Sequence, residues 1–197
     1  MEISVNTEMR DKIILACKKV FEKKHFSDIS MDDFAKATKM GRSSLYYYFK
    51  NKFEVFKAIA LIECMDVMKH AFEKTSAKNT LSENFIIFYS NKIKALTKLT
   101  TNRYPYILED VQTIPELFRG LMDETMACEK KTILRFLDWA ISSKEIAHVQ
   151  LDDLEFLSYV IVNTFKAIEF EIFLYGKTEF YENRIEWTSK ILTKGLT

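Results

Sequence analysis

Glycine and proline are scarce in this chain of 197 residues, which has four glycines and two prolines. An average protein devotes about 12% of its residues to this pair. Glycine and proline are the strongest interrupters of regular structure. Because the chain is poor in both and rich in Lys, Glu, Leu, Ile and Phe, we expect an all-α fold.

Cysteine is also infrequent, and long apolar runs are missing. Cys17, Cys64 and Cys128 are odd in number and far apart, and no CxxC motif or disulfide framework appears. The opening "MEISVNTEMRDK" has no apolar signal core, and no apolar run approaches the roughly 18 residues of a membrane helix. We expect a reduced, soluble, cytoplasmic protein.

Motifs for catalysis and metal binding are missing as well. The chain has no GxSxG, no HExxH and no Walker loop. Its three histidines, His25, His70 and His148, lack the spacing of metal ligands. We therefore expect neither an enzyme nor a cofactor nor a metal.

Charge is nearly balanced overall but unevenly distributed. The net charge is +1. Residues 1–57 carry 12 Lys and Arg against 8 Asp and Glu, whereas residues 58–197 carry 17 against 20. The positive first segment hints at an anionic partner.

The first segment has the pattern of a helix-turn-helix. Apolar residues at helical spacing predict a helix over residues 8–24. Ser30, with Asp33 three residues on, forms a capping box for a second helix. "TKMG" interrupts that helix, and a short third helix starts at Arg42.

Later helices are marked by further caps and breakers. "NKFE" at Asn51, "TLSE" at Thr80 and "TIPE" at Thr113 each resemble a helix start. Gly176 is placed to end a helix. We expect helices at about 51–74, 80–100, between Pro105 and Pro115, 115–142, 152–175 and 179–193.

The helix predicted over residues 152–175 is apolar on two opposite faces. One stripe holds Leu154, Leu157, Ile161, Phe165, Ile168, Ile172 and Tyr175. The other holds Phe156, Val160, Asn163, Ala167, Phe170 and Leu174. One stripe can pack on its own domain while the other needs a second surface, so we expect a symmetric homodimer. The alternative is that both stripes are buried within one monomer.

Three consecutive tyrosines, Tyr46 to Tyr48, occupy the short third helix. At about 100° per residue they span roughly 200° of its surface, so they cannot all be core. Leu45 and Phe49 are four residues apart and should face the core instead. The plain alternative is a helical hairpin whose tyrosines are merely solvated.

Residues 1–57 resemble the DNA-binding domain of TetR-type transcriptional regulators. The resemblance rests on Arg10, on "ILACKKVF" from residue 13 and on "SMDDFAKATKMGRSSLYYYFKNKFEVF" from residue 30. It covers less than a third of the chain. It implies a DNA-binding domain over residues 1–50 and a helical ligand-binding and dimerisation domain over residues 51–197.

The resemblance assigns the helix from Arg42 to the major groove of DNA. Arg42 and Ser43 would then contact base edges, with Arg42 suited to guanine. Ser44 would donate to a base or a phosphate, and Tyr46 would pack on a thymine methyl group.

It also assigns four residues to DNA phosphates. Tyr47 and Tyr48 would donate hydroxyl groups, and Lys52 would contribute a charge. Ser30 lies at a helix N-terminus, where a phosphate is electrostatically favoured.

The chain departs from the usual family pattern at three positions. His25 stands where a glycine is common, and histidine is among the residues enriched at positive φ. Lys39 stands where glycine is frequent in the turn, and Gly41 replaces the usual capping serine or threonine.

By the same resemblance, the protein would be a repressor that binds a palindromic operator as a dimer. Its second domain would bind a small apolar or amphipathic molecule, and this binding would release the dimer from the operator. The ligand-pocket candidates are Phe88, Tyr89, Met122, Met126 and Asn163. Asn163 could instead pair across the dimer. Lys92 and Arg119 could attract an acidic ligand, but the default expectation is that both are solvated at the surface. The candidates for the dimer interface are Phe156, Val160, Phe170, Leu174, Trp187 and Ile191.

Two other functions stay open at this point. The second domain could bind a partner protein, or the chain could be a helical carrier of small molecules that never binds DNA. The positive first segment and "RSSLYYYFKNK" argue against the carrier.

Overall fold

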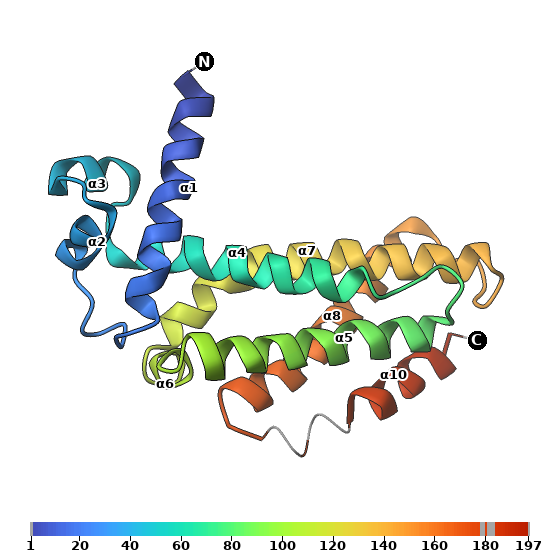
Figure 1. Cartoon of the computed structure of the whole chain (residues 1–197). Helices are drawn as coiled ribbons and strands as arrows, with labels where there is room; N and C mark the ends of the chain where they lie inside the picture. The colour runs from blue at the N-terminus through green and yellow to red at the C-terminus, as the bar shows by residue number, and fades with distance from the viewer. Residues whose placement is uncertain (1, 178–179, 181–183, 197) are drawn as a thin grey trace. The chain divides into compact units, whose positions relative to one another are not determined.

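A computed structural model describes residues 2–177, 180 and 184–196, with side chains from residue 7 (Figure 1). Within these ranges the regular structure is helical throughout, so the predicted all-α fold is confirmed. The helices are α1 (Glu2–Phe21), α2 (Met31–Thr38), α3 (Arg42–Tyr48), α4 (Lys52–Phe72), α5 (Leu81–Lys98), the π-helix η1 (Leu99–Arg103), α6 (Ile107–Thr113), α7 (Pro115–Ser142), α8 (Leu151–Phe173) and α10 (Arg184–Lys194).

Capping residues set the starts of three helices as predicted. The Asp33 amide donates to Ser30 Oγ (3.4 Å), and the Ser30 amide donates to Asp33 Oδ2 (2.9 Å). The same reciprocal box joins Thr80 and Glu83 before α5. Before α4, the Glu54 amide donates to the side chain of Asn51 (3.0 Å). Each side-chain oxygen satisfies an N–H group that the helix itself leaves free.

Other helix boundaries are partly as expected. Gly176 follows α8 with a φ of 68°, a conformation that glycine adopts without strain. Helix α1 begins at Glu2 rather than near residue 8, and η1 was not predicted. The predicted start of the last helix at residue 179 lies outside the described residues.

The chain forms two compact units. The first combines Met1–Glu63 with Lys98–Met122, and the second combines Cys64–Thr97 with Asp123–Thr197. The boundary between the two units does not coincide with the expected domain boundary at residue 50. That expected boundary divides the chain by function, and it stays a prediction. The difference arises because Val55, Phe56 and Ile59 from the start of α4 pack into the core of the first unit.

The core of the first unit holds the three N-terminal helices together. Its centre is aromatic, with Phe21 packed against Phe34 (5.5 Å between ring centroids), Phe56 (5.9 Å) and Phe26 (6.5 Å). Leu45 and Phe49 of α3 are buried in the same cluster. Burial of large aromatic rings is a strong stabilising contribution, so α3 is firmly anchored by its inner face.

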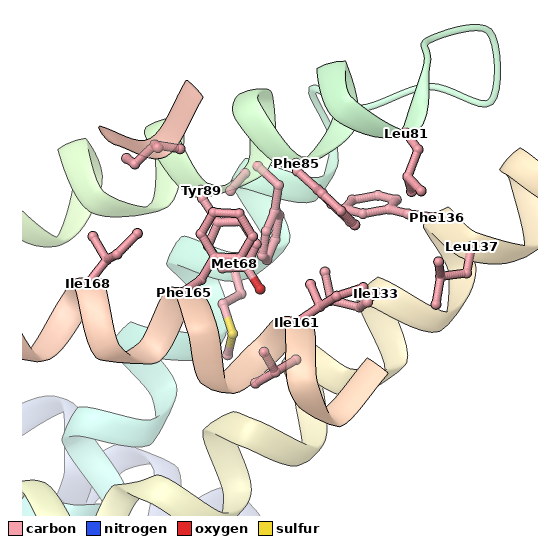
Figure 2. Packing of buried hydrophobic residues seen from close by; sticks show 14 of the residues in the cluster. Met68, Leu81, Phe85, Tyr89, Ile133, Phe136, Leu137, Ile161, Phe165 and Ile168 are labelled. Carbon is pink, nitrogen blue, oxygen red and sulfur yellow. The ribbon is translucent and has the colours of Figure 1, made fainter. Parts of the chain in front are cut away.

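The core of the second unit joins α5, α7 and α8 (Figure 2). Phe85 and Phe136 pack at 6.2 Å, and the ring of Tyr89 stacks on that of Phe165 at 3.6 Å. Met68 from α4 and Ile161 from α8 are among the other buried residues labelled in Figure 2.

Helix α8 presents one apolar face to this core and leaves much of the other exposed. Ile161, Phe165 and Ile168 are buried. On the opposite stripe, Phe156 is 68% exposed and Val160 is 37% exposed. One stripe is therefore buried within the monomer as expected, and the alternative that both are buried is wrong.

Candidate functional sites

Helix α3 has a buried side and an outward side. Leu45 and Phe49 are buried, as the four-residue spacing predicts, and the Arg10 guanidinium lies over the Phe49 ring at 4.9 Å. Tyr46 is 47% exposed and Tyr47 is 74% exposed. The outward side therefore presents aromatic rings that the fold does not use as core.

The third tyrosine of the row is placed differently from the other two. Tyr48 is half-buried and packs against the core of the first unit. Its ring also meets that of Tyr47 edge-on, at 5.1 Å between centroids. Tyr48 thus supports the orientation of Tyr47 while keeping part of its own ring accessible.

The start of α3 is joined to α2 by an ion pair that was not predicted. Asp32 accepts hydrogen bonds from both Nε and Nη2 of Arg42, and this contact raises the pKa of the guanidinium. Arginine has five N–H donors, so three remain, including both on Nη1. Ser43 and Ser44 beside it are exposed.

The turn between α2 and α3 uses unusual residues. Lys39 adopts the left-handed conformation (φ 55°, ψ 31°) where glycine would be unstrained. Its amide bonds to the α2 carbonyls and closes that helix. Gly41 is the N-cap of α3 and supplies no side-chain hydrogen bond. The turn thus keeps its helix-turn-helix geometry with a strained residue and a weak cap.

Lys52 is engaged within the protein. Its Nζ donates to the carbonyl oxygens of Phe26 (2.8 Å), Ser27 (3.2 Å) and Ile29 (3.0 Å), and it lies 4.5 Å from the centre of the Phe26 ring. An ammonium group has three donors, and these three contacts use them all. The expected phosphate contact of Lys52 stays untested, but its visible task is to tie α4 to the α1–α2 loop.

Ser30 is similarly occupied. Its hydroxyl donates to Asp33 Oδ2 at 2.7 Å, and Asp33 in turn accepts from Lys24 at 2.7 Å. These contacts, that of Lys24 first and those of Ser30 next, hold the pKa of Asp33 well below its usual range. Ser30 is thus a helix cap, and its contact with DNA remains a prediction.

His25 does not adopt the positive φ that its position suggested. The positive-φ residues of the described chain other than glycine are Lys39 and Lys144. Instead, His25 Nδ1 lies 3.1 Å from Asp110 Oδ1, and the Phe26 amide donates to the other Asp110 oxygen at 2.8 Å. The α1–α2 loop is therefore shaped by hydrogen bonds to α6 rather than by a left-handed residue.

A second buried carboxylate of the first unit was also missed. Glu63 lies 2.9 Å from Lys18 Nζ and 3.2 Å from Arg103 Nη1, and it accepts a hydrogen bond from the Tyr104 hydroxyl at 2.8 Å. Burial, followed by this hydrogen bond, raises the pKa of Tyr104. The contacts join α1, α4 and η1 within the unit.

The predicted ligand-pocket residues do not all lie together. Phe88 and Tyr89 are buried in the second core, and Met126 packs against it. Met122 belongs to the first unit. Asn163 is half-exposed, and its Nδ2 donates to the Tyr159 carbonyl at 2.8 Å, on the same side of α8 as Val160.

Lys92 was expected at the surface and is instead buried in the second core. It contacts the carboxylates of Glu129 and Glu169, and Lys166 contacts both as well. We call the side chains of Lys92, Glu129, Lys166 and Glu169 the charge tetrad. Each of these residues is at most 5% exposed. The sequence offered one sign of this buried cluster, because Lys166 and Glu169 lie one turn apart in an otherwise apolar helix.

The predicted dimer residues lie mainly on exposed or half-exposed faces. Phe156, Val160, Trp187 and Ile191 are exposed, and Phe170 and Leu174 are half-buried. The four-residue spacings place Trp187 and Ile191 on one side of α10, with the buried Ile185 facing inward.

Membrane-spanning helices and metal clusters are both missing from the described part of the chain. Across residues 2–177, 180 and 184–196, no helix is long and apolar enough to cross a membrane. In the same ranges, no three His, Cys, Asp or Glu side chains converge as metal ligands.

Comparison with known proteins bears on the first unit most directly. Residues 13–59 match the family model described as bacterial regulatory proteins, tetR family. No curated protein matches the chain. The matched stretch contains α2, α3 and the turn between them.

Solved structures share the fold of nearly the whole chain. A TetR-family transcriptional regulator from Pectobacterium atrosepticum is 17% identical, with 98% of this chain and 96% of that chain covered and a TM-score of 0.71. The transcriptional repressor QsdR of R. erythropolis is 13% identical, with coverage of 97% and 96% and a TM-score of 0.65. RolR in complex with the ligand resorcinol is 9% identical, with coverage of 98% and 90% and a TM-score of 0.65.

These comparisons favour a DNA-binding regulator over a carrier. The family model matches the helix-turn-helix segment, and the solved regulators cover both compact units. Residues 13–59 are therefore similar to the tetR family of bacterial regulatory proteins, and the chain shares its fold with solved TetR-family regulators.

Proposed function

We propose that the chain is a transcriptional repressor that binds a palindromic operator as a homodimer and is released by a small molecule. The observation that carries the DNA-binding part is the outward side of α3. Tyr46 and Tyr47 are exposed there, while Leu45 and Phe49 anchor the opposite side. A short helix anchored in this way can enter a major groove without loss of core packing.

Arg42 is our candidate for base recognition. Asp32 occupies its Nε side and leaves the Nη1 end of the guanidinium pointing away from that carboxylate. The two terminal nitrogens of an arginine suit the O6 and N7 acceptors of guanine. Ser43, Ser44 and Tyr46 would contribute further base or groove contacts, and Tyr47 and Tyr48 would donate to phosphates.

The exposed apolar faces of α8 and α10 support dimerisation. Phe156 and Trp187 are 68% and 59% exposed, and Val160 and Ile191, one turn further along each helix, are 37% and 49% exposed. Contiguous exposed apolar surface commonly marks an interface, and two-fold dimers are the commonest homo-oligomers. Asn163, on the same stripe of α8, would pair across this interface and set its register.

Release by a small molecule is supported by the relatives. QsdR is a repressor, and RolR holds resorcinol. For this chain we place the ligand in the second unit, where Phe88, Tyr89 and Met126 gather. A ligand that weakens operator binding must itself bind less tightly to the operator-bound protein, by the same factor.

The test is binding to duplex DNA from the region upstream of the protein's own gene. We expect a specific complex that survives excess competitor DNA and weakens steeply with salt, because phosphate contacts release counterions. Arg42→Ala should relax the base preference, whereas Lys50→Ala, at an exposed neighbouring lysine, should weaken all sequences alike. If excess competitor DNA abolishes the binding at every salt concentration, including the lowest, the proposal is contradicted.

A further inference from the structure

The charge tetrad is built from three helices of the second unit. Lys92 comes from α5, Glu129 from α7, and Lys166 with Glu169 from α8. Lys166 Nζ lies 2.7 Å from Glu129 Oε1 and 3.0 Å from Glu169 Oε2. Lys92 contacts the same Glu129 oxygen and the other oxygen of Glu169. Every lysine thus meets both glutamates, and the four charges sum to zero.

Stability alone does not account for this arrangement. Removing four charged groups from water carries a desolvation penalty of several kcal/mol for each ion, which the ion pairs offset only in part. Well-packed apolar side chains of similar volume often give equal or greater stability. Since Phe85, Phe136 and Ile161 already form an apolar core around these helices, the tetrad points to a role in recognition.

Two buried polar atoms lack hydrogen-bond partners among the described residues. One is Glu129 Oε2 of the tetrad, and the other is the hydroxyl oxygen of Tyr89. Glu169 Oε1 forms an ion pair with Lys92, but the two groups do not have the geometry of a hydrogen bond. Burial, and then the charges of Glu129 and Glu169, raise the pKa of Tyr89, so its hydroxyl stays neutral and keeps its proton.

Aromatic rings adjoin these polar atoms. Tyr89 stacks on Phe165 at 3.6 Å and meets Phe88 edge-on at 5.0 Å (Figure 2 labels Tyr89 and Phe165). Cys64 of α4 is close enough for all four tetrad charges to act on its pKa, which burial above all raises to about 11. Small-molecule sites commonly place a few polar groups among apolar and aromatic side chains, and the residues around the tetrad share that composition.

We propose that the charge tetrad and Tyr89 bind the polar end of the effector, and that this effector is an uncharged molecule with a hydroxyl group on an aromatic body. The inference rests on the proposed ligand-controlled function and specifies the ligand of that same site. A hydroxyl group donates to Glu129 Oε2 and hydrogen-bonds to Tyr89. A charged ligand would add an unbalanced charge to a buried neutral tetrad, at a large desolvation penalty.

The experiment compares four single-ring probes of similar size: phenol, toluene, benzoate and benzylamine. Dissociation constants for the full-length protein without DNA are measured by ligand-observed NMR. We expect phenol to bind at least tenfold more tightly than each of the other three, because a site built for a hydroxyl group discriminates strongly against analogues that lack it. Equal binding of toluene, tighter binding of benzoate or benzylamine, or no binding of phenol would each overturn the inference.

Variants then locate the contact. Tyr89→Phe keeps the ring that stacks on Phe165 and removes only the hydroxyl group, and Glu129→Gln keeps the volume of the side chain. Each should reduce the preference for phenol over toluene at least fivefold. The matched control is Lys130→Met, next to Glu129 on α7 but in a partly exposed ion pair with Glu155. Should Glu129→Gln fail to fold, Tyr89→Phe decides alone, and an unchanged preference in it would overturn the inference.

Binding of operator DNA by the wild-type protein is measured separately. A protein that binds its operator specifically but does not prefer phenol leaves the proposed DNA-binding function intact and refutes this inference. A protein that prefers phenol but binds no DNA specifically refutes the proposed function and leaves the site assigned.

Discussion

Lys52 holds together three carbonyl oxygens that would otherwise repel one another at the end of the α1–α2 loop. Hydrogen bonds to charged donors contribute about 1.5–3 kcal/mol each when well shielded and less near solvent. The half-buried Lys52 should therefore matter for the loop that positions α2, whether or not it meets a phosphate.

Replacing this lysine is the first test at the residue scale. We predict that Lys52→Met lowers the free energy of opening of α2, measured by amide hydrogen exchange, by about 1–2 kcal/mol. The exposed Lys50→Met serves as control and should change it little. If Lys52→Met leaves the exchange of α2 unchanged, the three carbonyl contacts are not structural.

Lys39 offers the opposite test, because its backbone is strained. The left-handed conformation disfavours side chains with a Cβ atom, by about 1–2 kcal/mol, and glycine adopts it freely. We predict that Lys39→Gly stabilises α2 by about 0.5–1 kcal/mol, after the larger entropy of the unfolded glycine is allowed for. Lys36→Gly, within the helix, should instead destabilise it by about 1 kcal/mol. A destabilised Lys39→Gly protein would contradict the assigned conformation.

Asp33 makes the cap of α2 sensitive to acid. Lys24, and then Ser30, lower the pKa of its carboxyl group in the folded protein. A lowered folded-state pKa gives stability that is present above the unfolded-state pKa of about 4 and is lost as the pH falls below it. We predict that Asp33→Asn is less stable than the wild type at pH 7 and that this difference shrinks between about pH 5 and pH 3. A difference that stays constant over that range in urea denaturation would contradict the assignment.

The two exposed apolar helix faces are the feature that matters most at the scale of elements. We predict that Phe156→Asp combined with Trp187→Asp gives a monomer at micromolar concentration in sedimentation velocity, while the wild type sediments as a dimer. Carboxylates in the centre of an apolar interface would be buried without partners. Lys190→Glu, on an exposed part of α10, is the matched control and should stay dimeric. A wild-type monomer would remove the role assigned to these faces.

Elements were largely predictable from the sequence because their signals are local. Ser30, Asn51 and Thr80 each cap a helix through contacts within four residues, and Gly176 ends α8 through its own backbone. The two-sided pattern of α8 also follows from spacing alone. In contrast, η1 has no known marker in the sequence, so its five residues were not anticipated.

Site residues were less predictable because their partners are distant along the chain. Lys92 is buried only because α7 and α8 bring Glu129 and Glu169 to it, and no local pattern shows that. His25 meets Asp110, which is 85 positions away. The side chains of α3 were predictable since Leu45 and Phe49 repeat at helical spacing, whereas the pairing of Arg42 with Asp32 was not.

At the scale of the whole molecule, one chain would join a DNA-binding unit to a ligand-binding core. Two copies related by a two-fold axis would present two α3 helices to successive major grooves, about 34–36 Å apart. A small change in that spacing suffices to abolish binding. The ligand must then weaken operator binding by the same factor by which the operator weakens ligand binding.

Selection of binding sites from a pool of random duplex DNA tests this claim most directly, because the selection assumes no operator sequence. We predict that the wild-type protein enriches inverted repeats whose half-sites are centred about 10 base pairs, or a multiple of one helical turn, apart. The Arg42→Ala protein should recover the same symmetry with a weaker base preference. Failure of the wild type to enrich any sequence, or enrichment of isolated half-sites alone, would contradict the account of a dimeric DNA-binding regulator.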